Sequence, residues 1–439
     1  MKDKRIKELF ASSVFILFIP FIINSQDVSV KVYPELKLQK IKSIGANYCQ
    51  VRLTGIASDS IGEETLKQFR PENVRVAIPL KVRGTDYQNY KGEKYVEQPM
   101  IKALLEFMKR MKNEYGVKSF TLSTWDVPNE LVVDPTATRA RVLKPEAYSE
   151  LLDLLVNFLV KAKNDYGFEV DYFSFNESEK GIAVIFSSAA TIAFIKVAIK
   201  RFKEAGLNTK FLLSDAAMPG TSREFATLIL ADSTIWKSLG PLAFHSWGSE
   251  RIPDSEFARV AALGKAINRP VWCTEMGHDG WAHREPAVFK TWDYAIRFTK
   301  ISQRVIKHSQ AEVTMYWTWQ NDYPIMSRDL KTYYPSFYAT QHFTNYLNTG
   351  TQIVNSMSSD PEVLTLSGIH ENGTRILQLI NLKKTAVNVK IQGLDSKSID
   401  IVTTTEAHNW EEDKNATVSR KGIISVTLKA ESINSILLN

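Results

Sequence analysis

The stretch 172-YFSFNESEKGIAVIFSSAATIAFIKVAIKRFKEAG-206 contains the repeating unit of most of the chain. A short apolar segment, 172-YFSFNE-177, precedes a longer one, 190–206, whose apolar residues recur every three or four positions before a glycine. This spacing is typical of an amphipathic helix, and glycine commonly follows the last helical turn. The stretch therefore predicts a β-strand followed by a helix.

The same alternation runs on both sides of this unit, and similar helical patterns occupy residues 98–116 and 147–167. Strands separated by such helices indicate βαβ units and a parallel sheet. The expected strands are 41-IKSIGANY-48, 74-VRVAIPL-80, 118-KSFTLSTWD-126, 172-YFSFNE-177, 210-KFLLSDAA-217, 241-PLAFHSW-247, 270-PVWCTEMG-277 and 313-VTMYWTW-319.

Eight such repeats over about 300 residues predict an α/β fold, a (β/α)8 TIM barrel, spanning residues 41–349. An open doubly wound sheet is the alternative. That fold binds nucleotides at a glycine-rich turn after a strand, and no such turn follows any of the eight strands. We therefore favour the barrel and expect no cofactor.

The pattern changes after residue 349. Residues 350–439 contain short strand-like segments with turns such as 371-ENG-373, which are typical of a β-sandwich domain. The extended stretch 28-VSVKVYPELKLQ-39 needs a partner sheet, so we expect residues 26–40 to join this sandwich. The strands expected in the domain are 362–371, 375–383, 386–394, 398–406 and 422–430.

The first residues resemble an export signal. Four basic residues precede the apolar run 10-FASSVFILFIPFII-23, and polar residues 24-NSQD-27 follow it. This run of fourteen residues is short for a membrane span. We predict a signal peptide over residues 1–25, a periplasmic or extracellular protein and no membrane insertion after cleavage, with an uncleaved anchor as the alternative.

Charge and cysteine content exclude other classes of protein. The chain has 55 basic and 48 acidic residues, a net charge of +7, and no Lys- or Arg-rich run beyond the extreme N-terminus. Nucleic-acid binding would require such a patch. The two cysteines, Cys49 and Cys273, do not form a disulfide framework, and we expect two buried free thiols. We also expect a monomer.

Catalytic residues of a TIM barrel project from the carboxyl ends of its strands. Glu177 and Glu275 both follow an apolar run in the same register. Two carboxyl groups facing each other across the barrel mouth are what glycoside cleavage requires: one protonates the leaving oxygen, and the other attacks the anomeric carbon or activates water. An oligosaccharide or polysaccharide is thus the expected substrate. Glu179 is the nearest competing carboxylate, and we expect it to face solvent.

The strand-end pair Asn176-Glu177, with Glu275 at the end of the seventh strand, resembles the clan of retaining glycosidases built on TIM barrels. Within this clan the chain most resembles glycoside hydrolase family 30. The entry 38-LQKIKSIGANY-48 is similar to the opening strand of that family, and 121-TLSTWDVPNEL-131 is similar to its third-strand motif. Ser178 stands where the family usually has proline, and 43-SIG-45 replaces its Gly-Phe-Gly turn.

The resemblance implies roles for individual residues. Glu177 is the general acid/base, Glu275 is the nucleophile, Asn176 hydrogen-bonds the 2-hydroxyl of the substrate, and Arg75 pairs with the nucleophile. The reaction implied is a double displacement on β-linked glycans.

The aromatic residues at the strand ends are candidates for sugar binding, and for most of them core packing is the alternative. We expect Trp125 to contact sugar. His245 and Trp247 either line the sugar site or, for His245, belong to the core. Trp317 and Trp319 share one face by two-residue alternation, and each is either a floor of the site or a core residue. Trp281, His278 and Tyr323 are candidates for outer subsites.

Two other functions remain as alternatives. A metal-dependent barrel hydrolase would need clustered histidines, but no histidine precedes His245 and no His-Glu-x-x-His motif occurs, so we expect no metal. A catalytically inactive carbohydrate-binding protein would be expected to lack one of the two glutamates, and both are present.

Overall fold

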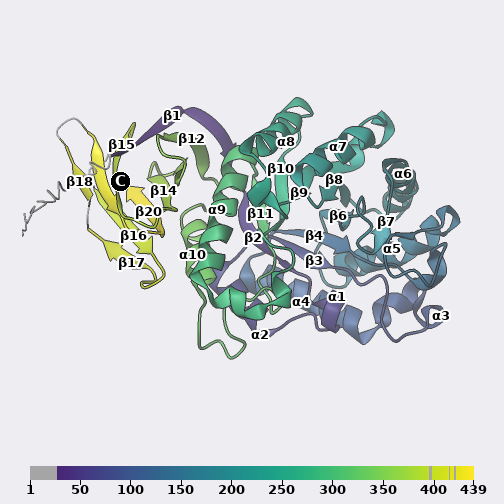
Figure 1. Cartoon of the computed structure of the whole chain (residues 1–439). Helices are drawn as coiled ribbons and strands as arrows, with labels where there is room; N and C mark the ends of the chain where they lie inside the picture. The colour runs from purple at the N-terminus through teal and green to yellow at the C-terminus, as the bar shows by residue number, and fades with distance from the viewer. Residues whose placement is uncertain (1–26, 395–397, 415, 420–421) are drawn as a thin grey trace, which may run out of the picture.

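The computed structural model describes residues 27–394, 398–414, 416–419 and 422–439, and these form two bodies side by side (Figure 1). The predicted signal peptide, residues 1–25, lies outside the described residues. Within the described part, no helix is long and apolar enough to cross a membrane.

The larger body is a closed barrel of eight parallel strands, which confirms the predicted fold class. Each strand falls within or beside a segment expected from the sequence. Around the barrel the order is β2 (Ser43–Tyr48), β3 (Asn73–Ala77), β4 (Ser119–Thr124), β6 (Tyr172–Phe175), β8 (Lys210–Ala216), β9 (Leu239–His245), β10 (Val271–Met276) and β11 (Val313–Tyr316).

Helices surround the barrel, and α4 shows why the sequence forms them. Its buried residues include Ile101, Leu104, Leu105 and Met108, which recur at helical spacing, and Gly116 ends the helix with a φ of 82°. The helices of the chain are α1 (Val51–Thr54), α2 (Ser60–Phe69), α3 (Tyr87–Tyr90), α4 (Pro99–Tyr115), α5 (Tyr148–Asn164), α6 (Ser188–Glu204), α7 (Pro219–Ile229), α8 (Asp254–Ala266), α9 (Trp292–Ser309) and α10 (Pro335–Thr344).

The smaller body is a ten-stranded, mostly antiparallel sheet of sandwich type with its own hydrophobic core. The strand order is β17-β16-β20-β14-β13-β12-β1-β15-β19-β18. The bounds are β1 (Val28–Lys40), β12 (Gln352–Ser358), β13 (Val363–Ile369), β14 (Arg375–Asn381), β15 (Val387–Gln392), β16 (Ile399–Thr404), β17 (Glu411–Asp413), β18 (Ala416–Val418), β19 (Ile424–Leu428) and β20 (Ser432–Leu438). The sequence patterns did not indicate β12, β17, β18 or β20.

Strand β1 lies inside this sheet and continues into the barrel (Figure 1). It runs antiparallel to β12 and parallel to β15, so that Val30 pairs with both Ser358 and Ile391. A Cβ atom on Gly393 would lie 2.0 Å from the carbonyl oxygen of Val32, and the φ of Gly393 is 88°. Only glycine fits where the chain passes β1 this closely.

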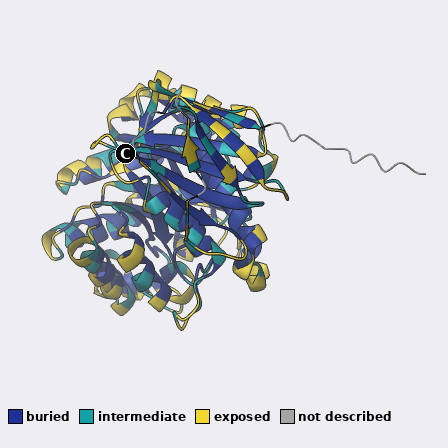
Figure 2. Cartoon of the chain, turned by 90° about the vertical axis from the view of Figure 1, so that its left-hand side faces the viewer, coloured by how far each residue is buried: buried dark blue, intermediate teal, exposed yellow. Residues whose placement is uncertain are grey.

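Helices α9 and α10 connect the two bodies through a shared apolar cluster that includes Trp292, Ile296, Ala339, Ile380 and Ile433. Buried residues fill the interior of both bodies, while the exposed residues lie on the outer surfaces (Figure 2). Two further short strands, β5 (Arg141–Val142) and β7 (Val184–Ile185), pair in parallel outside the barrel. Cys49 and Cys273 are buried free thiols, as expected.

Candidate active site

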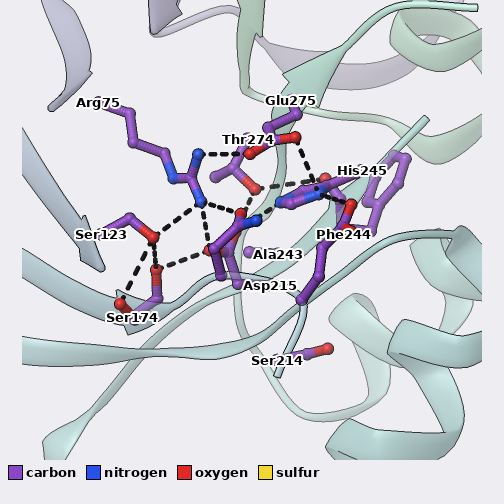
Figure 3. Close-up of polar contacts among 12 residues, drawn as sticks. Arg75, Ser123, Ser174, Ser214, Asp215, Ala243, Phe244, His245, Thr274 and Glu275 are labelled. Atoms are coloured by element: carbon purple, nitrogen blue, oxygen red, sulfur yellow. Dashed lines mark hydrogen bonds and ion pairs between the residues drawn. The ribbon is translucent and has the colours of Figure 1, made fainter. Parts of the chain in front are cut away.

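Polar residues from seven of the eight barrel strands meet at the centre of the barrel (Figure 3). They project from the second half of each strand, toward its carboxyl end, and are buried. The residues are Asn47 from β2, Arg75 from β3, Ser123 from β4, Ser174 from β6, Asp215 from β8, and Thr274 and Glu275 from β10, with His245 from β9.

The Arg75 guanidinium is the hub of this network. Its Nη1 donates to Glu275 Oε1 at 2.7 Å, and its Nη2 donates to Asn176 Oδ1 at 2.6 Å. It also donates to Asn47, Ser123 and Asp215. Burial by itself would lower the pKa of Arg75, but the carboxylates of Asp215 and Glu275 hold it above its usual value, so the guanidinium stays charged.

Glu275 is held through both of its oxygens. Arg75 binds Oε1, while Trp247 Nε1 donates to Oε2 at 3.0 Å and His245 Nδ1 lies 3.3 Å from the same oxygen. Burial raises the pKa of Glu275, and the charges of His245 and Arg75 oppose that rise. Trp247 in turn rests on Gly277, where an added Cβ would lie 2.6 Å from the indole.

His245 links the two predicted catalytic carboxylates to Asp215. Its Nδ1 lies 2.9 Å from Glu177 Oε1, and its Nε2 lies 3.2 Å from Asp215 Oδ1. Burial alone would lower the pKa of His245, but Glu275 and Asp215 raise it to about 10, helped by the hydrogen bonds to Asp215 and Glu177. At neutral pH both ring nitrogens therefore carry a proton and donate to carboxylates.

Asp215 is the buried counter-ion of the site. It accepts hydrogen bonds from Thr274 Oγ1 at 2.5 Å and Ser174 Oγ at 2.6 Å. Burial would raise its pKa, but Arg75 and His245 keep the pKa of this carboxyl well below its usual range. It stays ionised and balances two buried cations.

Asn176 and Glu177 follow β6 directly. Because Asn176 Oδ1 accepts from Arg75, its Nδ2 points elsewhere, and it bonds no described residue. Glu177 has a φ of 43°, in the left-handed region that is uncommon for residues other than glycine. Its backbone N–H donates to the Asp215 carbonyl oxygen at 3.2 Å.

A cavity of about 890 Å³ opens above this network. An oxygen of Glu177 and an oxygen of Glu275 lie within 4.8 Å of each other at its base. The predicted substrate-binding residues that line the cavity are Asn176, Trp125, Trp247 and Trp317. His278, Trp281 and Tyr323 line it as well.

The other predicted site residues lie elsewhere. Arg75 and His245 are fully buried beneath the cavity and hold its carboxylates rather than line it. Trp319 is fully buried and packs against Phe69, with ring centroids 4.6 Å apart. Strand β11 ends at Tyr316, so the two-residue alternation expected for Trp317 and Trp319 does not continue through them.

Glu179 differs from its expected position as well. It is partly buried rather than turned to solvent, and its Oε1 accepts the backbone N–H of Ala217 at 3.0 Å. Burial raises its pKa. It is not among the residues that line the cavity.

Sequence reasoning missed Arg52, which lines the cavity from α1, the short helix that follows β2. Its guanidinium carbon lies 4.6 Å from the ring centroid of Trp125 and 5.2 Å from that of Trp317. Asn47 was also missed, although it pairs in register with Arg75, and this register could have indicated it.

The geometry disfavours a divalent cation between Glu177, His245 and Glu275, whose ligand atoms lie within 4.8 Å of one another. A metal-bound histidine must offer an unprotonated nitrogen, but both nitrogens of His245 face carboxylates and carry protons. The Arg75 charge 2.7 Å from Glu275 would also repel the ion.

The comparisons with known proteins concern the fold. No family model and no curated protein sequence match this chain. A glycoside hydrolase family 30 endoxylanase from Clostridium papyrosolvens C71 matches with a TM-score of 0.74 and 17% identity, covering 94% of this chain and 100% of its own.

Two further solved structures match in the same way. A family 30 subfamily 8 xylanase from Clostridium acetobutylicum has a TM-score of 0.73 and 18% identity, covering 94% of this chain and 99% of its own. The catalytic domain of a family 30 xylanase from Talaromyces cellulolyticus has a TM-score of 0.69 and 14% identity, covering 94% and 100%. The chain therefore has the fold of these glycoside hydrolases: a TIM barrel with an attached β-sandwich.

Proposed function

We propose that the protein is a retaining glycoside hydrolase that cleaves β-linked glycans by double displacement. The observation that carries the proposal is the pair Glu177 and Glu275, whose oxygens approach within 4.8 Å at the base of a cavity lined by tryptophans. Retaining enzymes hold their two carboxyl groups about 5–5.5 Å apart, whereas inverting enzymes need about 6.5–9.5 Å to admit a water molecule.

The contacts of the two carboxylates differ in a way that suits two roles. Glu275 is bound by Arg75, Trp247 and His245, which favour a fixed anion able to attack the anomeric carbon. Glu177 has one side-chain contact, with His245. It lines the cavity, where its protonated form can donate to the glycosidic oxygen and its ionised form can later activate water.

Asn176 complements this pair. Its carbonyl oxygen is fixed by Arg75, so its amide N–H₂ is available to a sugar hydroxyl. Trp125, Trp247 and Trp317 offer aromatic faces to the rings of the substrate. The export signal predicted over residues 1–25 fits an enzyme that acts as a monomer on a glycan outside the cytoplasm.

The two glutamates should fail differently when replaced. Glu275→Ala removes the atom that bonds the anomeric carbon, so turnover of every substrate should be lost. Glu177→Ala should lose roughly 10²–10⁴-fold on natural glycans, whose leaving groups need a proton. A dinitrophenyl glycoside needs no acid in the first step, and added azide should replace the activated water in the second.

The measurement is kcat/KM on a panel of dinitrophenyl glycosides and polysaccharides, with and without azide. Glu179→Ala is the matched control, since it removes a neighbouring carboxylate outside the cavity, and it should retain wild-type kcat/KM. NMR of the first product should show the β-anomer. An α-anomer, azide rescue of Glu275→Ala instead of Glu177→Ala, or binding of glycans without hydrolysis would contradict the proposal.

A further inference from the structure

Four cationic side chains line the cavity without an ion pair or a side-chain hydrogen bond to any described residue. We name Arg139, Lys180, Arg251 and Arg284 the cationic rim. They lie on the segments that follow β4, β6, β9 and β10, so the sequence contains no basic run that would reveal them. The fold alone gathers them.

The acidic residues of the cavity do not neutralise this rim, because most already have partners. Asp279 is the remaining acid, and its Oδ1 accepts the backbone N–H of Trp281. The paired acids are Glu177 with His245 at 2.9 Å, Glu250 with Arg297 at 2.5 Å, Glu275 with Arg75 at 2.7 Å, and Asp322 with Arg52 at 3.9 Å.

Two of the rim cations are held next to each other by the backbone. The N–H of Ala140 donates to the carbonyl oxygen of Gly181 at 2.9 Å, and β5 and β7 continue this pairing. Arg139 and Lys180 immediately precede these bonded residues. Like charges on paired segments repel each other, and a bound anion would remove that repulsion.

A third rim cation lies beside an exposed aromatic ring. Trp281 is 58% exposed although it lines the cavity, and the guanidinium carbon of Arg284 lies 4.0 Å from its ring centroid. An indole stacks on the C–H face of a sugar ring, while a guanidinium binds carboxylate or sulfate oxygens. The pair can therefore hold both parts of a charged sugar.

We propose that the glycan bound in this cavity is anionic, and that the cationic rim binds carboxylate or sulfate groups on sugars outside the reacting position. The inference rests on the proposed function for the glycan, and on the rim for its charge. A neutral glycan would leave these four cations with Asp279 as the one acidic residue of the described cavity lining that is not already in an ion pair. An excess of unpaired cations at the rim of a cleft attracts ligands of the opposite charge.

The experiment compares binding to three polymers with one backbone: dextran, carboxymethyl dextran and dextran sulfate. All proteins carry Glu275→Gln, so hydrolysis does not interfere. The rim variant carries Arg139→Gln, Lys180→Gln, Arg251→Gln and Arg284→Gln. The control carries Lys67→Gln, Lys203→Gln, Lys237→Gln and Lys265→Gln, which are exposed, line no described cavity and change the net charge equally.

We expect the parent to bind at least one charged polymer and not dextran. The rim variant should lose about tenfold or more in affinity, because each exposed ion pair contributes a factor of roughly two to five. The control variant should lose less than about threefold in affinity. Its four lysines lie outside the cavity, so their removal should weaken only the long-range attraction of the polymer. Preference for the sulfated or the carboxymethylated polymer identifies the anion.

Equal losses in the rim and control variants, equal binding of dextran, or no binding of either charged polymer would overturn the inference. Should the rim variant fold poorly, the single changes Lys180→Glu and Arg284→Gln test the same claim. These outcomes are separate from the proposed reaction, since binding is measured without catalysis. If the wild type bound the charged polymer but hydrolysed no glycan, the proposed hydrolase function would be wrong, while the inference that the cationic rim binds anions would stand.

Discussion

Three residues in the centre of the site have backbone conformations that are uncommon for side chains with a Cβ. The φ angles are 43° at Glu177, 77° at Ser214 and 102° at Asp215. Each such residue costs about 1–3 kcal/mol and persists only where its surroundings fix it. Here the bond from Glu177 N–H to the Asp215 carbonyl and the buried network around Arg75 fix them. The site positions its carboxylates at the expense of stability.

Replacing Glu177 with two small residues tests this strain. Glu177→Gly and Glu177→Ala both remove the carboxylate, but glycine adopts a φ of 43° freely and alanine does not. We expect the glycine variant to be more stable than the alanine variant by about 1 kcal/mol. Chemical denaturation gives the two unfolding free energies. A more stable alanine variant would show that the backbone relaxes.

At this scale the sequence indicated the proposed catalytic pair but not the residues that hold it in place. Glu177 and Glu275 were identifiable because carboxylates at strand ends are unusual and face a common point. The network that holds the two glutamates depends on where side chains point in the folded barrel, and the order of residues in the sequence does not show this. Asp215 stood at a strand end without a predicted role, and Arg52 lies in α1, a helix of one turn that is too short to show a periodic pattern.

Among the elements, α9 carries a buried cation between the barrel and the sheet. Lys307 Nζ donates to the carbonyl oxygens of Ser356 at 2.7 Å and Thr365 at 3.0 Å. Burial lowers its pKa to about 8, and the distant Asp254 opposes this only in part. The helix therefore holds an ammonium group where its charge is disfavoured.

This shift predicts a pH dependence of stability. The folded pKa of Lys307 is about 8 and the unfolded pKa is about 10.4, so the folded state releases its proton first. The free energy of unfolding should rise as pH increases from about 8 to about 10.4. Below about pH 8 the buried charge of Lys307 should destabilise the folded state in full. Lys307→Met should remove this part of the pH dependence.

The measurement is the unfolding free energy of both proteins at several pH values between 7 and 10.5. The difference, wild type minus Lys307→Met, should change in favour of the wild type as pH rises. Lys300→Met serves as the control, since Lys300 lies on the same helix and forms no ion pair with the described residues of the sheet. A difference that stays constant across the range would contradict the predicted burial of charge.

Element prediction succeeded where helices and strands alternate and failed where short strands follow one another. All eight barrel strands were indicated, since helical patterns separate each one from the next. In the sheet, β12 and β20 escaped notice because their polar residues Asn355, Ser356, Asn434 and Ser435 interrupt the apolar pattern. Several of these polar side chains are buried and satisfied by hydrogen bonds, as Ser356 is by Thr365.

At the scale of the whole molecule, β1 joins the two bodies. Val30 is fully buried and lies between two partner strands, so Val30→Pro should remove a ladder hydrogen bond in the interior of the sheet, because proline has no backbone N–H to donate. We expect a loss of about 1–3 kcal/mol, since the acceptor that loses its hydrogen bond stays buried. Val418→Pro, at an exposed position of edge strand β18, should cost much less.

Thermal unfolding followed together with residual hydrolytic activity measures how tightly the bodies are coupled. If α9, α10 and β1 make them one cooperative unit, Val30→Pro should lower the temperature at which activity is lost as well as that at which the sheet melts. Activity that survives melting of the sheet would show that the barrel is stable without it.

The position of β1 has a further consequence for how the chain matures. The backbone N–H of Ser29 bonds Ser359 Oγ, a residue 330 positions away. At about 5–20 residues per second, a ribosome needs roughly 15–65 s to cover such a distance. For that time the strand with the buried residues Val28, Val30 and Val32 has no native neighbour. Newly made chains should therefore be most prone to aggregate before their last quarter is synthesised, and a chaperone that shields an extended apolar segment should improve the yield of folded protein.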